Sequence, residues 1–117
     1  MKYTGIIARL NGEPDQSGEI LSDNVEVPKH MVPVYLGFET APTPIGMAKV
    51  VKENNSIMAE IQFSDLIVLP MEEFYGVIGG KIVSRNGNVI TEWILTDIGI
   101  TDKPCDLSLP KLTKVNP

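Results

Sequence analysis

The chain has few of the residues from which a disulfide, a zinc site or a membrane span is built. Among its 117 residues there is one cysteine, Cys105, and one histidine, His30. A single cysteine cannot form an intramolecular disulfide, and the two residues together cannot supply the four ligands of a structural zinc site. No apolar stretch approaches the roughly 20 residues of a transmembrane helix, and we expect no signal peptide after Met1. The sequence therefore predicts no cofactor, no metal and no membrane partner, with synthesis in a cytosol.

Positive charge is also scarce. The net charge is −5, and the lysines and arginines form no run. Binding to nucleic acid depends on clustered cations that displace counterions from phosphates, so we expect no nucleic-acid partner. The apolar fraction of 43% and the charged fraction of 21% are ordinary for a globular protein. A chain of this length fits one domain that buries roughly two thirds of the surface its unfolded form would expose.

Nine prolines and ten glycines separate short apolar runs, which favours strands joined by turns over long helices. Asn54-Asn55 between two such runs predicts one hairpin, and Asn86-Gly87 predicts a second, because Asn-Gly is the strongest short-range hairpin signal. Gly79-Gly80 inside a strand indicates a bulge or a close approach of two backbones. We therefore expect an all-β fold, a small antiparallel barrel or sandwich.

Only the stretch 63–76, "FSDLIVLPMEEFYG", suggests a helix, and Pro70 interrupts it, so any helix is short. We expect residues 1–104 to form a single β-domain and residues 105–117 to form an extended C-terminal arm. In this arm leucines alternate with polar residues, and an extended segment of that kind can add a strand to a neighbouring protein or fill its grooves. Leu107, Leu109 and Leu112 are thus candidate interface residues, with a frayed tail as the alternative.

The residues supply no evident active site. No serine lies in a nucleophile-elbow pattern, and no glycine-rich stretch ends in the Lys-Ser or Lys-Thr of a phosphate loop. His30 lies in a connecting segment, where a solvated residue is more common than a general base, and Cys105 has no base near it in the sequence. Phe38, Tyr75 and Trp93 are most simply core residues. The residues alone thus indicate an acidic β-domain without catalytic machinery.

Four stretches, "DQSGEIL", "VPVYLGFETAPTPIGMAKVV", "YGVIGGKIV" and "LTDIGITDKPCD", occur in an order that resembles the tailed-phage prohead (head maturation) protease family. The resemblance covers about Gly5 to Asp106. It implies a fold similar to that of herpesvirus assemblin. In the family the second stretch ends in a catalytic His followed by an acid, the third holds a nucleophilic Ser, and the fourth has a Glu and a Ser.

This chain departs from the family at those positions. Phe38 stands at the position of the histidine and Val77 at that of the nucleophilic serine, while Asp97 and Gly99 replace the Glu and Ser of the last stretch. Phenylalanine cannot accept a proton and valine offers no nucleophile, so the resemblance implies a protease-like fold without catalysis. A shifted register that uses His30 as base and Ser84 as nucleophile is the alternative.

The family works within capsid assembly, so the resemblance implies a virion protein made in a bacterial host. Our leading hypothesis is a non-enzymatic auxiliary or decoration protein in the virion capsid, with the major capsid protein as partner and with self-association around capsomers as a further possibility. A divergent maturation protease is the enzymatic alternative. An inactive protease homologue that acts in scaffold or capsid assembly is the third.

Overall fold

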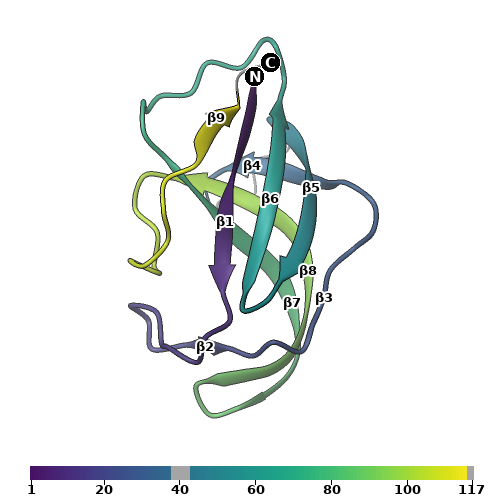
Figure 1. Cartoon of the computed structure of the whole chain (residues 1–117), viewed down its shortest axis with the longest axis vertical. Coiled ribbons are helices and arrows are strands. Elements are labelled where there is room, and N and C mark those ends of the chain that lie inside the picture. The colour runs from purple at the N-terminus through teal and green to yellow at the C-terminus, as the bar shows by residue number, and fades with distance from the viewer. Residues whose placement is uncertain (38–42, 116–117) are drawn as a thin grey trace.

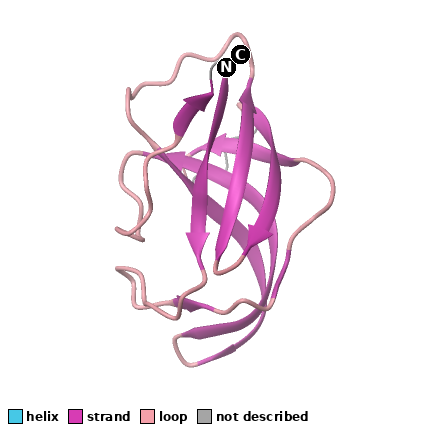
Figure 2. Ribbon diagram, in the orientation of Figure 1, coloured by secondary structure: helices cyan, strands magenta, loops and turns pink. Residues whose placement is uncertain are grey.

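The computed structural model describes residues 1–37 and 43–115, and every regular element in this part of the chain is a strand (Figure 2). The all-β prediction is confirmed. In chain order the strands are β1 (Lys2–Arg9), β2 (Ile20–Leu21), β3 (Val25–Glu26), β4 (Val32–Leu36), β5 (Gly46–Glu53), β6 (Ser56–Phe63), β7 (Tyr75–Asn86), β8 (Val89–Thr101) and β9 (Thr113–Val115).

The strands form one mixed sheet that does not close into a barrel (Figure 1). Its order is β2-β8-β4-β5-β6-β1-β9, and β3 and β7 also pair with β8. The prediction of an antiparallel barrel was wrong on two points, because the sheet stays open and because β2, β3 and β4 run parallel to β8. The segment from Ile20 to Leu36 advances along β8 from Val89 to Ile100 in three short pairings, so both chains run in the same direction.

Both predicted hairpins are confirmed, but the turn of the second lies one residue later than its Asn86-Gly87 pair indicates. Asn54 has a φ of 52° in the turn between β5 and β6, where Glu53 pairs with Ser56. In the hairpin of β7 and β8, Asn86 is still paired with Val89, so the turn residues are Gly87 and Asn88. Gly87, with a φ of 63°, takes the first central position, where a two-residue hairpin turn commonly requires glycine.

Replacing Gly87 with alanine should lower the free energy of unfolding by about 1 kcal/mol, the cost of holding an L-residue in the left-handed region. No atom lies within 4 Å of a Cβ added there, so strain and not a clash causes the loss. Gly87→Asn should cost clearly less, because asparagine populates this region more readily. Urea denaturation of the two variants checks the order, and equal losses would contradict it.

The stretch 63–76 forms turns, so the short helix that its sequence suggested is absent from the described residues. The Ile67 N–H donates to the Ser64 carbonyl at 3.1 Å, which closes a single turn. Pro70 then prevents the continuation of a helix. Leu69 and Met71 are partly buried and pack against the core.

The core consists of buried apolar side chains on the strands and on a few loop residues. Trp93 is buried on β8, as predicted, and its indole N–H donates to the Ser22 carbonyl at 3.2 Å. Phe63 packs edge-on against both Tyr3 and Phe74, with ring centroids 5.6 and 5.9 Å away. Tyr75 is half-buried, and Phe38 lies outside the described residues.

The segment that follows Pro104 turns at Leu107-Ser108 and then runs back along the same domain to β1 (Figure 1). Its last strand, β9, pairs with Lys2–Thr4 of β1, and the Leu112 N–H donates to the Phe74 carbonyl at 2.9 Å. Leu109 and Leu112 are buried within this chain, whereas Leu107 is 72% exposed. Of the three leucines, Leu107 therefore offers the most surface to a partner.

Candidate functional site

Two of the positions that the protease resemblance singles out, Val77 and Gly99, lie side by side. Val77 on β7 is directly opposite Gly99 on β8, because the register of the β7–β8 hairpin pairs them. A Cβ added at Gly99 would lie 2.9 Å from the Gly37 carbonyl oxygen and 3.3 Å from Val77 Cγ2. Gly37 immediately precedes Phe38, which lies outside the described residues.

β8 is the element that brings these positions together. β4 runs parallel to β8 on one side and ends beside Ile100, where the Gly37 N–H donates to the Ile100 carbonyl at 2.8 Å. β7 runs antiparallel on the other side and carries Val77 to the same level of the sheet. Segments from three of the matched stretches thus meet at one place on β8.

The chemistry at this place is apolar. Val77 is buried and has no nucleophilic atom, and Gly99 is buried with no room for a side chain against the Gly37 backbone. Asp97 lies two residues before Gly99, and its Oδ1 accepts a hydrogen bond from Thr96 Oγ1 at 2.6 Å. The two described positions, Val77 and Gly99, provide neither a nucleophile nor a base.

His30 and Ser84, the alternative pair, are not joined by a hydrogen bond in the described part of the chain. His30 is exposed in the segment before β4. Ser84 lies near the tip of the β7–β8 hairpin, with its Oγ 2.8 Å from Thr91 Oγ1. Cys105 is a free, exposed thiol. No group of three metal-ligating side chains occurs in residues 1–37 and 43–115.

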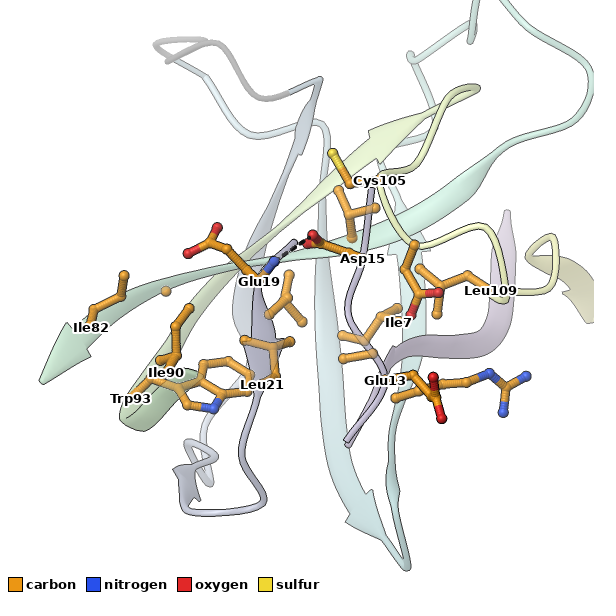
Figure 3. Close-up of a pocket in the computed structure, with 16 residues that line it drawn as sticks. Ile7, Glu13, Asp15, Glu19, Leu21, Ile82, Ile90, Trp93, Cys105 and Leu109 are labelled. Atoms are coloured by element: carbon orange, nitrogen blue, oxygen red, sulfur yellow. Dashed lines mark hydrogen bonds between the residues drawn. The ribbon is translucent and has the colours of Figure 1, made fainter. Parts of the chain in front are cut away.

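A pocket of about 240 Å³ lies where β1 and β7 fail to pair (Figure 3). We call it the seam pocket. Most of its lining is apolar and comes from strands β1, β2, β7 and β8 and from the loop after Pro104: Ile7, Ala8, Leu21, Val77, Ile78, Gly80, Ile82, Ile90, Trp93 and Leu109. Its remaining lining residues are Arg9, Glu13, Asp15, Glu19, Cys105 and Asp106.

Local hydrogen bonds hold the acidic side chains at the seam pocket. Asp15 Oδ1 accepts from the backbone N–H groups of Ser17 and Glu19 at 2.9 and 3.1 Å, which shapes the loop between β1 and β2 (Figure 3). Asp106 Oδ1 accepts from the Ser108 N–H at 2.9 Å. Glu19 forms an ion pair with Arg85 at 2.7 Å. These bonds fix carboxylates around the pocket.

Two surface ion pairs that do not line the pocket shift the pKa of one of their partners. The hydrogen bond from Lys2, at 2.9 Å, lowers the pKa of the Glu60 carboxyl below its ordinary value. The hydrogen bond to Glu73, at 2.7 Å, raises the pKa of Lys111. Both pairs are exposed, where such contacts contribute little to stability.

Two exposed apolar residues escaped the sequence analysis. Leu66 and Val68 are 92% and 91% exposed in the segment between β6 and β7. The run "LIVL" at 66–69 lies in the stretch 63–76, which suggests a short helix from its sequence. Its flanks, Asp65 and Pro70, are the signals that could have indicated a turn and therefore an exposed apolar tip.

Comparisons of the chain with protein-family models, with curated proteins and with solved structures find no match. In the described residues, no helix has the length and apolar character needed to cross a membrane. What the fold defines is an all-β protein built on one mixed sheet that remains open.

Proposed function

We propose that this protein is a non-enzymatic structural protein of a tailed-phage virion, with a fold related to that of the prohead proteases. The observation that carries the proposal is the convergence of Gly37, Val77 and Gly99 on one level of β8. These residues belong to three stretches matched separately in the sequence, and their meeting supports the proposed relation of the folds. The side chains at this place support a role without catalysis, because Val77 and Gly99 cannot perform proton transfer or nucleophilic attack.

The proposed role is that of an auxiliary or decoration protein that binds the shell of major capsid protein. Leu66, Val68 and Leu107 provide exposed apolar side chains that a capsid subunit can bury. A protein that binds only the assembled shell stabilises it by mass action, because disassembly must also break those contacts. This mechanism needs many copies and no turnover.

Quantitative mass spectrometry of purified mature particles tests the proposal. We expect the full-length chain at a fixed ratio to the major capsid protein, with both termini intact, in a copy number of the same order as that of the shell subunits. Absence from the mature particle would contradict the decoration role, and so would a small number of self-cleaved fragments. The second result would favour a maturation protease and direct attention to His30 and Ser84.

A further inference from the structure

The seam pocket is bordered by two strand edges that lack backbone partners. In the described residues, β7 pairs only with β8, and residues 5–9 of β1 pair only with β6. The two strands nevertheless lie close together, and a Cβ on Gly76 of β7 would lie 2.7 Å from Ile7 Cγ2 of β1. The pocket lies between the same two strands, where no ladder joins them. Unpaired N–H and C=O groups at such edges can bind an extended chain.

The interior of the pocket favours an apolar group of limited size. Its volume of about 240 Å³ is below the range of about 300–1,000 Å³ that is typical of pockets for drug-sized ligands. Its apolar lining includes the side chains of Ile7, Leu21, Trp93 and Leu109. These dimensions suit one or two aliphatic side chains.

The charges at the pocket favour a cationic partner. Four carboxylates, from Glu13, Asp15, Glu19 and Asp106, line it with one cation, Arg9. Arg85, which does not line the pocket, neutralises the charge of Glu19 through their ion pair. A second copy of this chain is disfavoured as the occupant, because each copy carries a net charge of −5.

We propose that the seam pocket binds an extended segment of a partner protein in which one or two aliphatic side chains alternate with lysine or arginine. The aliphatic side chains fill the pocket, the cations lie against its carboxylates, and the backbone pairs with the free edge of β7. Alternation keeps the cations out of the apolar interior, because successive side chains of an extended chain point to opposite faces. This inference goes beyond the virion role, since it holds for a partner of any origin.

Calorimetric titration with three synthetic peptides tests the inference. The peptide acetyl-Lys-Leu-Lys-Leu-Lys-amide should bind at least about tenfold more tightly than the matched peptide with serine for leucine, because leucine gains more from burial. The affinity of the leucine peptide should exceed that of the peptide with glutamate for lysine by a similar factor. Higher salt should weaken the binding of the leucine peptide. Fluorescence of Trp93, the single tryptophan, should change on binding because this residue lines the pocket.

A pair of charge variants locates the binding site. Glu13→Lys changes an exposed residue of the lining and should weaken binding of the leucine peptide about fivefold. Glu53→Lys makes the same change in net charge at an exposed residue outside the lining, and it should weaken binding less than twofold. Thermal unfolding confirms that both variants are folded. Blocking the Cys105 thiol with N-ethylmaleimide should also weaken binding of the leucine peptide, because this side chain lines the pocket.

Four results would overturn the inference. They are equal affinity for the leucine and serine peptides, equal effects of the two charge variants, no binding by any of the three peptides, and self-association of the chain that the Cys105 adduct abolishes. The last result would identify a second copy as the occupant. None of them bears on the copy number in mature particles, so the virion role stands or fails separately.

Discussion

Ile98→Ala is expected to lower the free energy of unfolding by about 2–5 kcal/mol, the range for removing a buried isoleucine side chain down to its Cβ. Ile98 is 0% exposed on β8. It pairs with Val34 on β4 and with Ile78 on β7, so its side chain lies where the parallel and antiparallel parts of the sheet meet. A cavity there removes packing contacts shared by both parts, and neither can shift to fill it without breaking its register.

Ile82→Ala is the matched control, because it makes the same substitution on the neighbouring strand β7 at a residue that is 45% exposed. Its cost should stay below about 1 kcal/mol, as most of the deleted surface is already hydrated. Urea denaturation followed by Trp93 fluorescence measures both losses. Similar losses for the two variants would show that Ile98 is not a central core residue.

The local parts of the fold could be predicted from the sequence. Turn chemistry at Asn54 and Gly87 acts over a few residues, and both hairpins formed where it indicated. The parallel pairings of β2, β3 and β4 with β8 could not be predicted in this way. They join residues more than sixty positions apart, such as Val34 and Ile98, and no turn between them specifies the partner.

The register at the candidate site could not be predicted from the sequence either. A regular hairpin closed by Gly87 and Asn88 would place Val77 opposite Ile98. The irregularity between Gly79 and Gly80 shifts the register so that Val77 is opposite Gly99. The two glycines indicated a bulge, and the bulge is confirmed, but the sequence does not specify which strand gains the extra residue. The seam pocket was also beyond prediction, because it depends on two strands that do not pair.

Leu112→Asp is expected to lower the free energy of unfolding by about 4 kcal/mol or more, since it combines the loss of a buried leucine with the burial of a carboxylate. Leu112 is 7% exposed, and its side chain lies over two glycines that leave space for it. A Cβ on Gly5 would lie 2.9 Å from Leu112 Cδ2, and one on Gly76 would lie 3.4 Å from Leu112 Cδ1. Leu112 therefore bridges β1 and β7 beside the seam.

Leu107→Asp is the control, because it makes the same change five residues earlier in the same segment at a leucine that is 72% exposed. Its cost should be within about 0.5 kcal/mol of zero. If Leu112→Asp does not fold, Leu112→Ala gives a measurable loss of about 2–4 kcal/mol. Equal stability of the Leu112 and Leu107 variants would mean that the C-terminal segment is a free arm in solution. A large difference would establish that this segment stabilises the domain, leaving Leu107 as its leucine for partners.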